Sequence, residues 1–347
     1  FRQWGSLTPG HPEYGHTVGV ETTTGPLGQG VANGVGMALA EAYLAARFNR
    51  PGYPVVDHYT YVLSGDGCLM EGISYEAASL AGTLRLGKLI LLYDSNDITI
   101  EGGTDMAFTE DVGKRFEAMG WHVQQVEDGN DVDAITNAIA NAKAETAKPS
   151  MIRVRTQIGY GCAKQGTAGV HGSPLGVECL ADTKENLGWP AAPDFYVPDA
   201  VYAHTKEIED KGKTARREWD RLFAAYREEY PQLAAEWERW HRDELAVDLE
   251  NDESFWQFDE GKTATRASSG IVLNRLAERV PNLVGGSADL APSNNSVMKS
   301  REYFSPEDRT GSNIHFGVRE HAMAAIGNGM TLHGGLKPYV ATFFVFS

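Results

Sequence analysis

The apolar positions of residues 29–156 follow two spacings that alternate along the chain. Apolar residues three and four apart predict amphipathic helices, whereas short continuous apolar runs predict strands buried on both faces. Residues 70–86 show the first spacing, and residues 88–94 (KLILLYD) form such a run. Helices are predicted at 29–49, 70–86, 110–119 and 131–146, and strands at 58–64, 88–94, 121–126 and 151–156. We therefore expect an α/β fold with a doubly wound parallel sheet.

The pattern changes beyond residue 157. Residues 158–198 are rich in glycine and proline and predict a long irregular loop, residues 199–246 predict charged helices, and residues 248–259 predict a linker. A second α/β segment follows, with predicted helices at 263–279 and 318–332 and predicted strands at 282–286 and 338–346. The last strand is apolar enough to be buried, although chain termini usually lie at the surface. We therefore expect the chain to be a fragment of a longer protein.

Length and charge narrow the class of protein. A chain of 347 residues suggests about two domains. The formal net charge of −16, from 31 Lys+Arg and 47 Asp+Glu, argues against nucleic acid or an anionic membrane surface as a partner. Three cysteines without a CxxC pair argue against a disulfide framework or a zinc ribbon and favour a reducing, cytoplasmic location. No apolar run reaches the roughly 18 residues of a membrane span, so we expect no membrane partner.

Two polar side chains follow neighbouring predicted strands. Asp66 comes after strand 58–64, and Asn96 comes after strand 88–94. Because a strand–helix–strand crossover brings the carboxyl ends of parallel strands to one sheet edge, we expect these side chains to converge. With the carbonyl of Ile98 they would form part of a Mg²⁺ site completed by phosphate and water. The alternative is structural, with Asp66 capping the next helix and Asn96 in a turn, and the spacing leaves both interpretations open.

Two glycine-rich segments approach nucleotide-binding motifs without fulfilling them. In residues 22–30 (TTTGPLGQG), which suit the approach of an anion to a helix start, Asn33 stands where the third glycine of a dinucleotide motif belongs. In residues 82–88, a predicted helix precedes the segment and a strand follows it, the reverse of a P-loop, and Leu89 replaces the required Ser or Thr. We therefore exclude both nucleotide-binding classes.

Several further side chains have both a structural and a functional interpretation. His11 and His171 lie in glycine-rich loops, which often carry chemistry. Glu320 begins a predicted helix, where it would also complement the helix dipole. Phe343 and Phe346 fit a plain apolar core as well as a ligand pocket.

Taken together, these segments are similar to those of the transketolase family, which binds thiamine diphosphate. The stretch from Gly65-Asp66-Gly67 to Asn96 resembles the diphosphate–metal motif that related enzymes share. More specific matches are residues 8–13 (TPGHPE), 23–30 (TTGPLGQG), 285–294 (GGSADLAPSN) and 317–321 (GVREH). The resemblance covers essentially all 347 positions and implies a diphosphate domain at 1–235, a linker at 236–262 and part of a pyrimidine domain at 263–347. It also implies that the start of the first domain, the rest of the second and a third domain are missing.

The resemblance assigns roles to individual residues. The implied ligands of Mg²⁺ (or Ca²⁺) are Asp66, Asn96 and the carbonyl of Ile98. The implied cofactor contacts are Gly25, Pro26, Leu27, Gly67, Asn96, His171, Asp289, Phe343 and Phe346. The implied substrate ligands are His11, His171, Arg266 and Ser293. Glu320, His11 and His171 are the implied catalytic groups, with Glu320 hydrogen-bonded to the pyrimidine ring and the histidines moving protons at substrate oxygens.

The implied activity is transfer of a two-carbon ketol unit between sugar phosphates. The donors would be xylulose 5-phosphate or sedoheptulose 7-phosphate, and the acceptors ribose 5-phosphate or glyceraldehyde 3-phosphate, in the pentose phosphate pathway or a photosynthetic cycle. The resemblance also implies a homodimer with active sites at the subunit interface. A dihydroxyacetone synthase-like ketol transferase and a non-catalytic interaction protein on the same fold are the alternatives. The sequence departs from the family pattern at two places. Cys162 stands where a serine is common, and the stretch at 164–170 is one residue shorter than in some members.

Overall fold

A four-stranded parallel sheet forms the centre of the first unit, with the strand order β1-β2-β4-β3. The computed structural model describes residues 2–23, 25–242, 244–245 and 247–347, so Thr24 of the predicted 22–30 segment and Asp243 and Ala246 of the predicted helical region lie outside it. The strands are β1 (Thr60–Gly65), β2 (Leu89–Ser95), β3 (His122–Val126) and β4 (Ser150–Arg155). All four predicted strands are confirmed within two residues, and every pairing is parallel, as the buried apolar runs predict.

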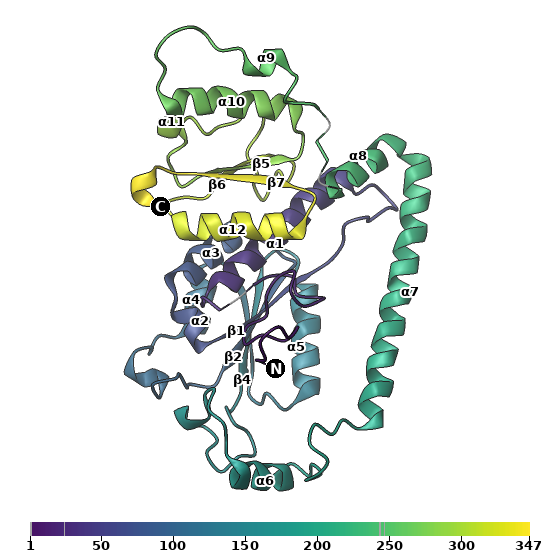
Figure 1. Cartoon of the computed structure of the whole chain (residues 1–347), viewed down its shortest axis with the longest axis vertical. Helices are drawn as coiled ribbons and strands as arrows, with labels where there is room; N and C mark the ends of the chain where they lie inside the picture. Colours follow the sequence, from purple (N-terminus) through teal and green to yellow (C-terminus); the bar gives the residue numbers. More distant parts are fainter. Residues whose placement is uncertain (1, 24, 243, 246) are drawn as a thin grey trace.

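Helices cover this sheet on both faces (Figure 1). They are α1 (Gln29–Phe48), α2 (Asp66–Met70), α3 (Gly72–Thr83), α4 (Val112–Ala118) and α5 (Val132–Ala144). The single helix predicted over 70–86 is wrong at both ends. Glu71, with φ −68° and ψ 132°, is extended and separates α2 from α3, and Arg85, with φ 51°, is left-handed and ends the helical path.

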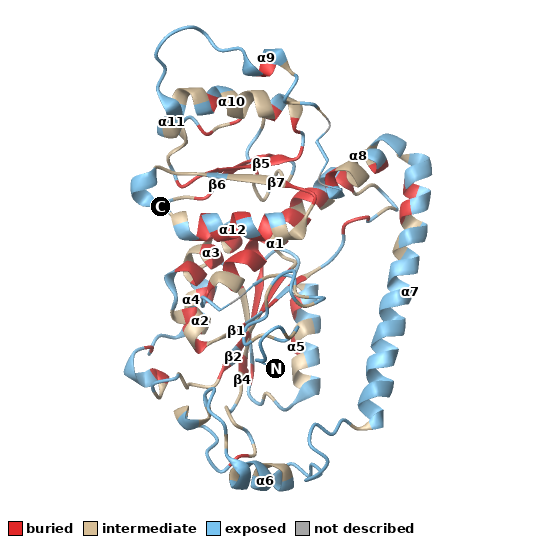
Figure 2. Cartoon of the chain, in the orientation of Figure 1, coloured by how far each residue is buried: buried red, intermediate tan, exposed pale blue. Residues whose placement is uncertain are grey.

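Three helices follow the first sheet along the chain. They are α6 (Val177–Asn186), α7 (Asp199–Glu229) and α8 (Pro231–His241). The prediction of an irregular loop over 158–198 is therefore wrong for α6, which was missed because none of its residues is buried and its sequence shows no apolar stripe. Figure 2 shows α7 almost wholly exposed except near its C-terminal end, where Phe223 and Tyr226 are buried. None of the described helices combines the length and apolar character that crossing a bilayer requires.

The second unit contains a three-stranded parallel sheet in the order β6-β5-β7. Its strands are β5 (Leu283–Ser287), β6 (Asn313–His315) and β7 (Lys337–Ala341), and its helices are α10 (Thr265–Arg279), α11 (Ala291–Asn294) and α12 (Glu320–His333). The prediction of a buried strand through residue 346 is wrong beyond Ala341. That residue pairs with Ser287, the last residue of β5, so the chain beyond it has no paired neighbour and forms the 3-10 turn η3 (Phe344–Phe346), which is exposed.

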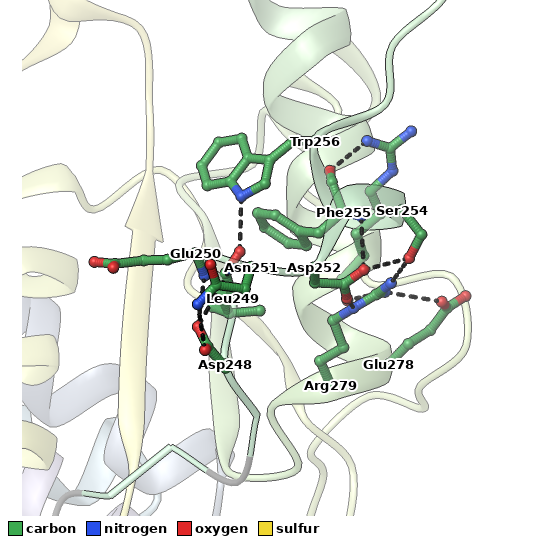
Figure 3. A network of polar contacts seen from close by, with 11 residues as sticks. Asp248, Leu249, Glu250, Asn251, Asp252, Ser254, Phe255, Trp256, Glu278 and Arg279 are labelled. Atoms are coloured by element: carbon green, nitrogen blue, oxygen red, sulfur yellow. Dashed lines mark hydrogen bonds and ion pairs between the residues drawn. The ribbon is translucent and has the colours of Figure 1, made fainter.

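The segment predicted as a linker is attached to the second unit by a polar network (Figure 3). Asp252 caps the short helix α9 (Glu253–Trp256) and accepts a 2.6 Å hydrogen bond from Arg279 Nε, while Arg279 Nη2 donates to Ser254 Oγ at 2.8 Å. The Arg279 guanidinium lowers the pKa of Asp252 to about 2, so this carboxylate stays charged down to acidic pH. Asp252 and Ser254, at the start of α9, therefore lie against α10.

The two units share one hydrophobic core through the packing of α1 against α12. Glycines allow this close approach. A Cβ on Gly329 would lie 2.0 Å from the carbonyl oxygen of Asn33, and a Cβ on Gly36 would lie 2.1 Å from that of Ile326. Both obstacles are backbone atoms, so neither helix can accept even a methyl group at these positions without moving. A second contact joins the two units. Nε2 of His58, two residues before β1, lies 2.9 Å from Nε2 of His333, the last residue of α12.

This geometry predicts a large difference between two glycine-to-alanine substitutions. Gly329→Ala is expected to lower the free energy of unfolding by about 1–3 kcal/mol, because overpacking forces the helices apart. Gly212→Ala in α7, where an added Cβ meets nothing within 4 Å, is expected to raise it by up to about 1 kcal/mol through helix propensity. Urea unfolding of both variants measures the difference. Equal stability of the two variants would contradict the tight helix contact.

Candidate functional site

The candidate site begins where β1 and β2 end. Gly65 pairs with Asp94 in the parallel register, so the residues that follow the two strands lie at the same sheet edge. Asp66 Oδ2 accepts hydrogen bonds from the backbone N–H groups of Asn96 (3.2 Å) and Asp97 (3.0 Å), and Oδ1 accepts one from the Tyr93 hydroxyl. Asp66 and Asn96 therefore lie together at this edge, as expected, although the contact is made by the backbone N–H of Asn96 and not by its side chain. The helix-capping alternative is not confirmed, because the N-cap of α2 is Gly65 and the Asp66 carboxylate bonds to the turn after β2.

The chemistry of this turn suits a hard cation. Asp66 is 4% exposed, and its burial raises the pKa of the carboxyl despite the hydrogen bonds from Tyr93 and the backbone. A bound divalent cation would compensate a carboxylate that is otherwise costly to bury. The side-chain oxygen of Asn96, which accepts from Ile98 N at 3.0 Å, and the Ile98 carbonyl are the other oxygen donors of the turn.

These oxygens do not complete a coordination shell. In the part of the chain that the structure describes, no group of three or more histidine, cysteine, aspartate or glutamate side chains could hold a metal ion. A Mg²⁺ ion at Asp66 would thus take several ligands from water or from a phosphate-bearing molecule. The turn faces a cavity of about 520 Å³, lined by Asn96 and Ile98 on one side and by Thr156, Tyr160 and Gly166 on another.

A glycine loop lies over the start of α2. An added Cβ on Gly67 would lie 3.0 Å from Leu27 Cδ1, so the loop at 25–27 and the turn at 65–67 are in contact. Gly28 is the left-handed N-cap of α1, with φ 83°, and a Cβ there would lie 2.6 Å from Ile73 Cγ2. The loop also brings in His11, whose ring lies 3.7 Å from the position of a Cβ on Gly25. Four of the predicted residues, His11, Gly25, Leu27 and Gly67, are therefore neighbours.

His171 lies in a different environment from His11. It follows the 3-10 turn η2 (Ala168–Val170) and is exposed. The segment that contains His171 connects Gly166, which lines the cavity of about 520 Å³, to α6.

Glu320 is the first residue of α12 and is half-buried. The start of this helix is held against α3 by two contacts. Ala322 N donates to Glu76 Oε2 at 3.1 Å, and Arg319 Nη2 donates to Ser79 Oγ at 3.0 Å. Glu76 was missed by sequence reasoning, because its partner is 246 residues away and no local pattern points to it. No hydrogen bond or ion pair between described residues joins Glu320 to Asp66.

The other predicted residues of the second unit lie at its exposed edge. Arg266 and Ser293 are exposed near the starts of α10 and α11, which are joined by a 3.5 Å hydrogen bond from Asn295 Nδ2 to the Arg266 carbonyl. Asp289 follows β5 with a left-handed φ of 58° and lines a cavity of about 280 Å³. Phe343 is half-buried and Phe346 is 54% exposed, so the plain-core interpretation is wrong for Phe346.

Two joined parallel α/β units, the first with oxygen donors gathered at one sheet edge, match two family models of the thiamine diphosphate-binding class. Residues 1–246 match "Transketolase, thiamine diphosphate binding domain", and residues 261–347 match "Transketolase, pyrimidine binding domain". The chain belongs to the transketolase family, which confirms the resemblance and the predicted fold class.

Individual relatives support the same assignment. The chain is 55% identical to a transketolase of Streptococcus pyogenes, over 100% of this chain and 47% of the relative, and 49% identical to Transketolase 1 of Escherichia coli, over 100% and 52%. Among solved structures, transketolase from Leishmania mexicana has a TM-score of 0.94 at 47% identity, over 99% of this chain and 51% of the other. A transketolase complex with sedoheptulose 7-phosphate from Pichia stipitis has a TM-score of 0.95 at 46% identity, over 99% and 52%. The chain spans about half the length of the curated relatives it matches.

Proposed function

We propose that the protein to which this chain belongs is a transketolase that uses thiamine diphosphate and Mg²⁺ (or Ca²⁺). The observation that carries the proposal is the buried Asp66 carboxylate at the joined ends of β1 and β2, in a chain that is 55% identical to a named transketolase. A cation there would anchor a diphosphate without any basic cluster, which fits the net charge of −16.

The residues at this edge fit the cofactor. The donor set of Asp66, Asn96 and the Ile98 carbonyl consists of hard oxygens, and a Cβ on Gly67 would lie only 3.0 Å from Leu27 Cδ1, so a side chain at this position would crowd the loop. We propose that Gly67 and His171 contact the diphosphate and that Gly25, Pro26 and Leu27 line the cofactor. When bound, thiamine diphosphate supplies the electron sink for breaking and forming a carbon–carbon bond beside a carbonyl.

The remaining assignments concern proton transfer and substrate binding. Glu320 would hold a proton at a ring nitrogen of the pyrimidine, between the aromatic walls Phe343 and Phe346 and with Asp289 nearby. His11 and His171 would move protons at the substrate oxygens. Arg266 and Ser293 would bind the sugar phosphate, since a guanidinium and a hydroxyl suit its oxygens.

The finer details of the proposal concern substrates and assembly. We propose ketol transfer from xylulose 5-phosphate or sedoheptulose 7-phosphate to ribose 5-phosphate or glyceraldehyde 3-phosphate, in the cytoplasm. We also propose a homodimer whose sites lie between subunits, with domains at 1–235 and 263–347 joined by a linker at 236–262.

Calorimetric titration of the full-length protein with thiamine diphosphate tests the proposal. Binding is expected with Mg²⁺ present and is expected to be lost after chelation with EDTA, because the diphosphate is held through the ion at Asp66. Thiamine without phosphates is the control ligand and is expected to bind far more weakly. Absence of binding, or binding unaffected by the chelator, would support the non-catalytic alternative instead.

A further inference from the structure

Two of the three cysteines form a close pair beside the candidate site. Cys162 lies in the turn after β4, and Cys179 lies in the first turn of α6. Their Sγ atoms are 3.0 Å apart, and both are free thiols. Cys162 is 3% exposed and Cys179 is half-buried, whereas Cys68 lies apart from this pair in α2.

The surroundings make the two sulfurs chemically unequal. The Sγ of Cys162 is hydrogen-bonded to the Cys179 thiol, and it accepts a second hydrogen bond, at 3.3 Å, from the backbone N–H of Lys164. These bonds lower the pKa of Cys162, and the same contact raises the pKa of Cys179. The Cys162 thiol is thus the more readily ionised of the two, and the Cys179 Sγ lies within reach of it.

Side-chain hydrogen bonds to Gly161 hold the turn of Cys162 close to α6. Asn186 Nδ2 at the end of α6 donates to the carbonyl of Gly161 at 2.9 Å, and Gly161 N donates to Gln165 Oε1 at 2.9 Å. An added Cβ on Gly161 would lie 2.8 Å from Leu187 Cδ2, so the turn and the helix end are in direct contact. The sulfurs need to approach by only about 1 Å to reach the length of a disulfide, about 2.05 Å.

We propose that Cys162 and Cys179 are a reversible oxidation site that forms an intramolecular disulfide on reaction with hydroperoxides. The Cys162 thiolate attacks one peroxide oxygen, the O–O bond breaks, and the leaving oxygen takes up a proton as water, or as an alcohol if the peroxide is organic. Cys162 is then a sulfenic acid. Cys179, losing its proton, attacks that sulfur and displaces the hydroxyl group, which leaves with the proton as water. The protein loses two electrons and the peroxide gains them.

The disulfide would close a loop that contains a predicted site residue. Cys162 and Cys179 are 17 positions apart, and His171 lies between them on an exposed stretch. Oxidation therefore restricts the segment 163–178, and a thiol reductant releases it.

Thiol counting on the full-length protein tests the site. After treatment with hydrogen peroxide, wild-type protein and Cys68→Ser are expected to lose two thiols each, with a 162–179 cross-linked peptide in mass spectra that dithiothreitol removes. Cys162→Ser and Cys179→Ser are each expected to form no intramolecular disulfide. Wild-type hydrogen exchange over 163–178 is expected to slow after oxidation and to recover on reduction.

Three outcomes would overturn the proposal. One is retention of all thiols after peroxide, another is a disulfide that involves Cys68 or a second chain, and the third is unchanged hydrogen exchange in the cross-linked protein. The Cys179→Ser variant keeps the buried Cys162 in place, so the test does not depend on the folding of Cys162→Ser.

Discussion

Replacing Glu320 by glutamine is expected to reduce transketolase turnover by about 10²–10⁴-fold, the usual contribution of a positioned acid or base. Glutamine keeps the shape of the side chain but cannot hold or release the proton that the proposed mechanism requires at the pyrimidine ring. The fold is expected to remain intact. Glu320 is the half-buried first residue of α12, where loss of its charge at the helix start costs no more than about 1 kcal/mol.

Steady-state kinetics of Glu320→Gln, with thermal unfolding beside it, measures both effects. Glu307→Gln is the matched control, because its carboxylate is 73% exposed and lies outside the proposed machinery. The control is expected to keep wild-type turnover. Near-normal turnover of Glu320→Gln would remove this residue from the mechanism, whereas equal losses in both variants would indicate a non-specific effect of charge.

Replacing Asp66 by asparagine is expected to abolish Mg²⁺-dependent binding of thiamine diphosphate. Two backbone N–H groups and the Tyr93 hydroxyl donate to this carboxylate, so an amide would satisfy only some of these donors and would also weaken the cation site. Each donor left without an acceptor costs about 1–3 kcal/mol, partly offset by removal of a buried charge. The variant without ligand is therefore expected to fold with moderately reduced stability.

The measurement is the rise in melting temperature on adding Mg²⁺ and thiamine diphosphate. At a ligand concentration of about 100 times Kd, wild-type protein gains about 2.7 kcal/mol from binding, and Asp66→Asn is expected to gain none. Asp97→Asn is the control, because it removes one charge from the same turn but keeps the backbone N–H that contacts Asp66. A ligand-induced rise in Asp66→Asn equal to that of wild type would disprove the metal site.

The first sheet could be predicted from the sequence because each of its strands carries its own signal. Residues 88–94 are apolar on both faces, and β2 occupies 89–95. The Asp66–Asn96 contact followed from the same reasoning, since parallel neighbours place their carboxyl ends together. Two elements gave no signal, for different reasons: β6 has only three residues, Asn313–His315, too few for a pattern, and α6 buries none of its ten.

Contacts between the two units could not be predicted from local patterns. The bond from Ala322 N to Glu76 depends on how α12 lies against α3, and nothing in either helix alone specifies it. The strand predicted at 338–346 is wrong beyond Ala341 for a related reason. Its composition predicts burial, but β5 ends at Ser287, so the sheet offers nothing to pair with beyond Ala341.

The backbone contact between α1 and α12 also determines which parts of the chain are free to change over evolution. Gly36 and Gly329 each touch a carbonyl of the opposite helix, so the helices themselves specify how the two units meet. Asp252 and Arg279 attach the last part of the covalent connection to the second unit, whereas Glu236 and Trp240 at its start contact Arg47 and Phe48 of α1. A change at either glycine therefore demands a compensating change in the other half of the chain.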